Sequence, residues 1–168
     1  MKRIATLVPA VILICSCLFG CGVPKDKPVT EVWLGDTAET VQKLEPGLEE
    51  RYDKTRNLLT SLSGTRDFDG LKGEISFRFN LETGKVGQIG WQATLPEADA
   101  QAAFDKLYAE VADSFGKPNQ INDNRNEGAL APYQCFWNGR GYMVCVSLTN
   151  GLLDGTYYCG YSVIIPLR

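Results

Sequence analysis

Residues 74–94, EISFRFNLETGKVGQIGWQAT, decide the fold of this chain. In residues 74–80 apolar and polar side chains alternate strictly, and the apolar ones are Ile75, Phe77 and Phe79. A period of two predicts a half-buried strand. Residues 81–85 contain Gly84, which can adopt a positive φ in a turn, and residues 86–94 return as the partner strand. The stretch therefore predicts an antiparallel hairpin with one face in the core.

Three helices are predicted around this hairpin. Asp36-Thr37-Ala38-Glu39 has the capping-box arrangement and opens a short helix that Pro46-Gly47 ends. In residues 48–62 apolar side chains recur at a spacing near 3.5, which indicates a second helix. Pro96 opens a third, whose apolar stripe consists of Phe104, Leu107, Tyr108, Val111 and Phe115 and which Gly116 and Pro118 end.

The remaining residues predict a loop and three strands. Residues 119–132 are polar and without a period, which is typical of a long loop. The strands that follow are Tyr133–Asn138, Tyr142–Thr149 and Thr156–Ile165. The fold class is therefore α+β: an antiparallel sheet of about five strands with helices packed on one face. The element order is compatible with two tandem helix-plus-hairpin units.

The first 20 residues have the layout of a secretory signal: a basic start, an apolar run and small residues before a cysteine. Residues 18–21, LFGC, resemble the lipobox of bacterial lipoproteins, although Phe19 departs from the small residue usual at that position. The resemblance implies that Cys21 is lipidated and becomes the first residue of the processed protein. Two acyl chains hold a protein to a membrane almost permanently. Cys17 is a second candidate, and an unmodified secreted protein is the alternative.

The chain is 168 residues long, which suits one domain. We assign residues 1–20 to a lipoprotein signal peptide, residues 21–32 to the lipidated cysteine and a tether, and residues 33–168 to a single α+β domain. The tether contains two prolines and no apolar period. In Gram-negative members of the lipoprotein family, Gly in place of Asp after the cysteine, as at Gly22, permits passage to the outer membrane. The resemblance therefore implies a lipid-anchored, extracytoplasmic protein of the cell membrane or outer membrane.

The body carries a second resemblance, on short motifs. Gly35-Asp36-Thr37 caps a helix, a hairpin follows, and Phe115-Gly116-Lys117-Pro118 ends a later helix before more strands. This order is similar to the tandem repeat of the β-lactamase-inhibitor-protein-like fold, which small outer-membrane assembly lipoproteins also use. The resemblance covers residues 33–165 and implies binding of another protein; an unrelated α+β domain is the alternative.

Composition excludes several classes of function. The formal net charge is −3, and no run of Lys and Arg with aromatic residues is present, so we expect no nucleic-acid binding. Histidine is absent, which removes the usual general base of hydrolases and the commonest metal ligand. We therefore expect that the protein is not an enzyme and that it has no cofactor and no metal site, and we assign no catalytic residues.

Three cysteines remain in the predicted domain, namely Cys135, Cys145 and Cys159. Strand parity places Cys135 and Cys159 on the core face with a strand between them, about 10 Å apart, too far for a disulfide. Cys145 faces the other way. A bulge in the turn at residues 139–141 would place Cys135 opposite Cys145 and allow one disulfide between them. We favour the alternative, in which all three cysteines are free thiols that act as small packing residues.

The same parity leaves Phe136, Met143, Cys145 and Tyr158 on the opposite face of the sheet. Either the Asn-rich loop, the segment around Trp33 or a second chain covers them, or they form a partner-binding surface. We predict a non-enzymatic protein-binding or envelope-assembly module, attached to the membrane through Cys21, with Phe136, Met143 and Tyr158 in contact with another envelope protein. The alternative is a small-ligand-binding lipoprotein with a pocket between helices and sheet.

Overall fold

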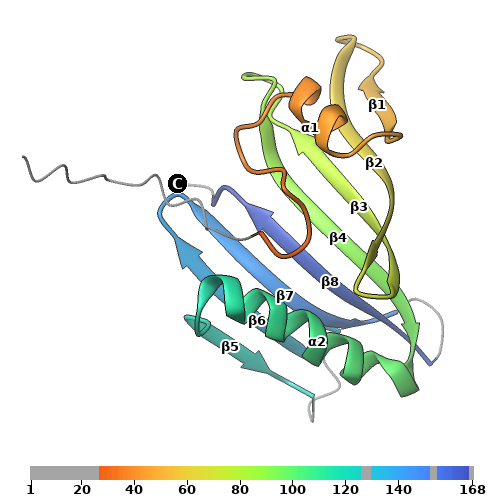
Figure 1. The fold of residues 1–168 in the computed structure, drawn as a ribbon, viewed down its shortest axis with the longest axis vertical. Coiled ribbons are helices and arrows are strands. Elements are labelled where there is room, and N and C mark those ends of the chain that lie inside the picture. Colours follow the sequence, from red (N-terminus) through yellow and green to blue (C-terminus); the bar gives the residue numbers. More distant parts are fainter. Residues whose placement is uncertain (1–26, 126–129, 152–154, 167–168) are drawn as a thin grey trace, which may run out of the picture.

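The structure, a computed structural model, describes residues 27–125, 130–151 and 155–166, so the predicted signal peptide and Cys21 lie outside the described residues. The described chain forms one antiparallel sheet of eight strands with two helices (Figure 1). In chain order the elements are α1 (Ala38–Leu44), β1 (Glu49–Asp53), β2 (Leu58–Phe68), β3 (Leu71–Phe79), β4 (Val86–Pro96), α2 (Glu97–Phe115), β5 (Gln120–Asp123), β6 (Tyr133–Gly139), β7 (Tyr142–Asn150) and β8 (Thr156–Ile164).

The sheet consists of two four-stranded meanders joined in the middle. Its strand order is β1-β2-β3-β4-β8-β7-β6-β5, so β4 and β8 are the central pair and β1 and β5 are the edges. Along the chain, a helix followed by four strands occurs twice. β4 and β8 pair from Gln88 opposite Ile164 to Pro96 opposite Thr156. This long central ladder makes one continuous surface of the two meanders.

The predicted antiparallel sheet of about five strands with helices packed on one face is wrong, because the described chain has eight strands and only two helices. Residues 48–62, predicted as a helix, contain β1 and the start of β2. The Asp53 carboxylate accepts hydrogen bonds from the backbone N–H groups of Thr55 and Arg56 at 2.8 and 3.2 Å, and Asn57 adopts a φ of 51°. These features form a turn between the two strands, which a helix does not permit.

Two smaller expectations also change. The predicted loop 119–132 contains β5, a four-residue strand that pairs only with β6 at the edge of the sheet. The cap of α1 is Thr37 and not Asp36: the Thr37 hydroxyl accepts from the N–H of Thr40 at 3.3 Å, whereas the Asp36 carboxylate accepts from the N–H of Trp33. The predicted units of a helix and a hairpin are in fact units of a helix and four strands.

The central predictions are confirmed. β3 and β4 form the predicted hairpin, and α2 follows Pro96 and ends at Phe115. The last three strands pair in sequence as β6, β7 and β8. Their predicted bounds differ from the observed ones by no more than one residue.

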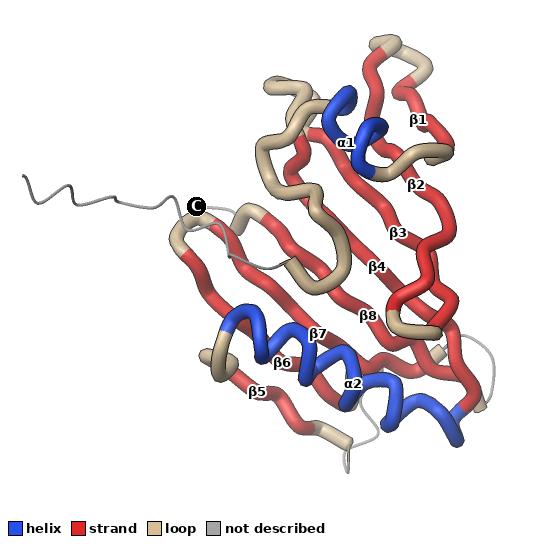
Figure 2. The backbone as a smooth tube through the Cα atoms, in the orientation of Figure 1, coloured by secondary structure: helices blue, strands red, loops and turns tan. Residues whose placement is uncertain are grey.

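One face of the sheet is packed against α2, α1 and the N-terminal segment, which lie in front of it in Figure 2. One cross-strand row of this core face is buried along its whole length and consists of Leu62, Phe77, Ile89, Val163, Val144 and Trp137. α2 presents Phe104, Leu107 and Val111 to it. We call residues 29–36 the N-terminal strap. Because Val29 and Val32 in the strap are buried in the core, the folded domain begins before residue 33 and the predicted tether 21–32 is shorter than expected.

A buried carboxylate fastens the strap to the sheet. The Thr30 hydroxyl donates to Glu45 Oε1 at 2.7 Å, and Arg66 Nη1 of β2 lies 2.7 Å from Glu45 Oε2. Thr30 and Glu45 are the only buried polar side chains among the described residues. A buried charge is tolerated when it is paired and hydrogen-bonded, as here. The strap, the end of α1 and β2 are therefore held at one point.

Aromatic packing fixes the other end of the strap. The Trp33 ring stacks on Phe115 with centroids 6.3 Å apart and meets Tyr142 edge-on at 5.3 Å. Phe115 ends α2, and Tyr142 begins β7. Trp33 thus joins the strap to the helix and strand of the second meander.

We predict that Trp33→Ala lowers the free energy of unfolding by about 3–5 kcal/mol, because it removes a buried indole and leaves a cavity. Denaturant titration followed by circular dichroism measures this change. Tyr52→Ala serves as the control, since Tyr52 is 48% exposed, and should change stability by less than about 0.5 kcal/mol. Equal, small losses for the two variants would contradict the anchoring role of Trp33.

Candidate functional site

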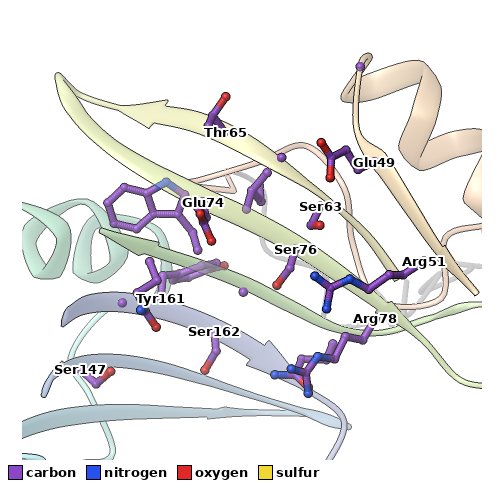
Figure 3. A pocket seen from close by; sticks show the side chains of 18 residues that line it. Glu49, Arg51, Ser63, Thr65, Glu74, Ser76, Arg78, Ser147, Tyr161 and Ser162 are labelled. Carbon is purple, nitrogen blue, oxygen red and sulfur yellow. The ribbon is translucent and has the colours of Figure 1, made fainter. Parts of the chain in front are cut away.

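The face of the sheet opposite the helices is open. Its side chains alternate with those of the core face, and on β2, β3 and β4 the longer ones are largely exposed. A hollow of about 660 Å³ lies over this open face, from β1 to β4 and across β8 (Figure 3). The structure thus combines one packed face with one hollowed, solvent-facing side.

The floor of the hollow is made of small residues in one cross-strand row. Ser63, Ser76, Gly90 and Ser162 lie directly opposite one another on β2, β3, β4 and β8. We call them the serine row. A Cβ at Gly90 would lie 3.2 Å from the Ser76 hydroxyl, so these strands leave little room even for an alanine. Small side chains keep the backbone accessible and give the hollow its depth.

Two arginines lie in the next row of the open face. Arg51 on β1 and Arg78 on β3 both pair with Ser61 on β2, which lies between them. Both arginines are exposed, and both line the hollow. Neither guanidinium forms a hydrogen bond or ion pair with another described residue. Among the described residues, the two arginines of the hollow are therefore not paired with a carboxylate.

Acidic side chains also line the hollow, at other positions. Glu74 lies on β3 beyond Ser76, four residues from Arg78, which places their Cα atoms about 13 Å apart. Glu49 lies on β1, two residues from Arg51 on the same face. Neither carboxylate forms an ion pair within the described chain. Charges of both signs thus stand apart on this face, a pattern that suits a polar partner of fixed orientation.

The structure places the predicted contact residues on the open face but does not gather them all. Phe136 lies opposite Cys145, and Met143 lies opposite Ile164. These four side chains are half-buried and lie together beside the hollow, and we call them the apolar patch. Tyr158 is on the same face but four residues along β8 from Ser162, the partner of Cys145. It is therefore not part of the patch.

The segment around Trp33 does not cover the apolar patch. Trp33 packs on Phe115 and Tyr142, on the core face of the sheet. β5, the described strand of the Asn-rich segment, extends the edge of the sheet beyond β6. Two of the three coverings considered from the sequence are thus absent among the described residues.

The three cysteines of the domain are free thiols. Cys135 and Cys159 are buried on the core face of β6 and β8, with β7 between them, as the strand parity predicted. Cys145 faces the other way, and burial among its neighbours raises the pKa of its thiol to about 12. The thiol therefore stays protonated and weakly nucleophilic at neutral pH. Across the described residues, no three His, Cys, Asp or Glu side chains gather closely enough to hold a metal ion.

A second, smaller cavity of about 260 Å³ lies where the first turns of α2 meet the end of the sheet. Glu97, Gln101 and Arg125 contribute its polar groups, and Leu148 and Tyr157 its apolar ones. The Arg125 guanidinium is already engaged with Asp123 at 2.5 Å and lies 4.4 Å from the centre of the Tyr133 ring. The larger hollow therefore offers the more extensive set of unengaged polar groups.

Neither Arg51 and Arg78 nor the serine row is among the residues that the sequence predicts as a site. Strict alternation in residues 74–80 does place Ser76 and Arg78 on the outer side of their strand. Arg51 gives no such signal, because residues 48–62 are predicted as a helix. Recognition of the Asp53 turn as a hairpin would still have paired Arg51 with Thr60 and turned it to the core side, because the register of β1 and β2 shifts between Arg51 and Tyr52.

Comparison of the chain with protein-family models, with curated proteins and with solved structures finds no match. Within residues 27–125, 130–151 and 155–166, neither helix is both long and apolar enough to cross a bilayer. Function must therefore be argued from the open face and from the N-terminal sequence.

Proposed function

We propose that this protein is a membrane-anchored extracytoplasmic lipoprotein, attached through Cys21, that binds another envelope protein with the open face of its sheet. It acts as a non-enzymatic binding or envelope-assembly module. The open face is the observation that carries the proposal, because it holds unpaired charges in the hollow and an apolar patch beside it.

The N-terminal sequence supports the anchor. Residues 1–20 have the layout of a secretory signal, and LFGC at residues 18–21 resembles a lipobox. The first core residue is Val29, eight residues after Cys21, and eight extended residues span at most about 28 Å. The domain would therefore stay close to the membrane surface, which favours a partner in or at that membrane.

The shape of the hollow supports a protein partner over a small ligand. Small-molecule sites usually enclose most of the ligand between mainly apolar walls. Here the floor is the sheet itself, and Arg51, Glu74 and Arg78 on its walls are exposed. A segment of a second protein can cover such a surface and bury the apolar patch at the same time. The motif resemblance at residues 35–37 and 115–118 points to the same use of a sheet face.

We predict that Cys21 carries fatty acid. Cells that express the full chain and are fed an alkyne-labelled fatty acid should incorporate label into the wild type. Cys21→Ser should lose the label and leave the membrane fraction, because the two acyl chains supply most of the membrane affinity. Cys17→Ser is the matched control and should keep both. Labelling that survives Cys21→Ser would contradict the assignment.

We further predict that a photo-crosslinking amino acid in place of Gln92 captures a protein partner in intact cells. Gln92 is exposed, lines the hollow and lies next to the serine row. Gels and mass spectrometry should show one discrete adduct. The same amino acid at Glu110, which is exposed on α2, is the control and should give no such adduct. Equal capture at both positions, or none at Gln92, would contradict binding through the open face.

A further inference from the structure

Arg51 and Arg78 are placed to act on one anionic group. They lie in one cross-strand row with Ser61 between them, so their Cα atoms are about 10 Å apart. Figure 3 shows the two side chains extended in the same direction over the sheet. An arginine side chain is long enough to bridge half of that separation. Both guanidinium groups can therefore reach a single group above Ser61.

Several cations of the sheet and α2 are paired within the described chain, whereas Arg51, Arg78 and Lys72, all exposed on the open face, are not. Arg66 pairs with Glu45, Lys106 with Asp69 and Arg125 with Asp123. Arg51 and Arg78 instead share a row with no carboxylate in it, and Glu49, two residues from Arg51 on the same face, forms no ion pair with it. Like charges on neighbouring strands repel. A carboxylate from outside would relieve the repulsion and accept the forked donors of arginine.

The same row continues into the apolar patch. Beyond Arg78 it passes through Gln88 on β4, Ile164 on β8 and Met143 on β7. From Arg78 to Ile164 there are two strand spacings, again about 10 Å. An extended chain covers that distance in about three residues, since each residue advances by about 3.3 Å. Charge at one end of the row and apolar surface at the other thus have a fixed separation.

We infer that an extended segment of a protein partner lies in the hollow and reaches over the apolar patch beside it, with an Asp or Glu carboxylate on Arg51 and Arg78 and, about three residues away, an apolar side chain on Ile164 and Met143. The serine row beside it leaves space for the segment's backbone and offers hydroxyl groups to it. This inference rests on the proposed function and adds the chemistry of the partner.

An anionic lipid headgroup offers the same charge, but the layout of the row favours a protein. The basic end and the apolar end of the row lie about 10 Å apart on the same face of the sheet, with Gln88 between them. A side-chain pattern along an extended peptide matches that layout. A lipid places its phosphate at the end of long chains that would need a deep apolar groove.

The test uses the full chain with the photo-crosslinking amino acid at Gln92. Arg51→Ala with Arg78→Ala should reduce the protein adduct at least tenfold, because each charge-assisted contact accounts for about a tenfold change in affinity. Lys43→Ala with Lys117→Ala removes the same charge from exposed positions outside the hollow and should leave the adduct unchanged. Thermal unfolding of both double variants checks that the fold is retained.

Sequencing of the crosslinked peptide gives the second readout. The captured segment should contain an acidic residue about three positions from an apolar one. Arg51→Glu with Arg78→Glu should abolish capture, and replacement of that partner acid by Lys should restore it. An adduct that persists in the Arg51→Ala, Arg78→Ala variant would overturn this inference and leave the proposed function standing. A lipid adduct, or no adduct from the wild type, would overturn both.

Discussion

Trp33 stacks on Phe115 and meets the edge of Tyr142, and through these contacts the strap closes the core over one face of the sheet. The buried Glu45 carboxylate, which binds Thr30 and the partly exposed Arg66, holds its other end. Because the strap and both helices lie on the same side, no segment of the described chain covers the opposite face of the eight-stranded sheet. An uncovered face of that extent must be polar or must be covered by a partner, and this face is polar over one meander and partly apolar over the other.

The division of the open face follows from the topology. β4 and β8 join the two meanders, so the charged rows of β1 to β4 continue without a break into the apolar patch of β6 to β8. Arg78, Gln88 and Ile164 are neighbours in space although they are far apart in the sequence. The chemistry of the hollow is therefore a property of the long central ladder and exists in neither meander alone.

Sequence patterns predicted the parts of this fold that have one buried face. The β3–β4 hairpin and α2 bury apolar stripes, so their apolar residues recur in the sequence with the period of a strand or a helix. The alternation along β6 to β8 placed Phe136, Met143 and the cysteines on the correct faces of the sheet. The edge strands β1 and β5 are mostly exposed on both sides, so they carry no period of two. Arg51 was missed for this reason, and with it the arginine pair. The turn at Asp69-Gly70, where both residues have positive φ, is a hairpin signal that extends the sheet to β2.

The central claim is that a partner covers the open face in the living cell, and hydroxyl-radical footprinting tests it most directly. Met143, in the apolar patch, is readily oxidised when it is accessible. The account predicts that its oxidation in intact cells falls several-fold below that in the purified protein, whereas oxidation of Leu44, which is 41% exposed on α1, is the same in both. Equal oxidation of Met143 in the two preparations would contradict the claim.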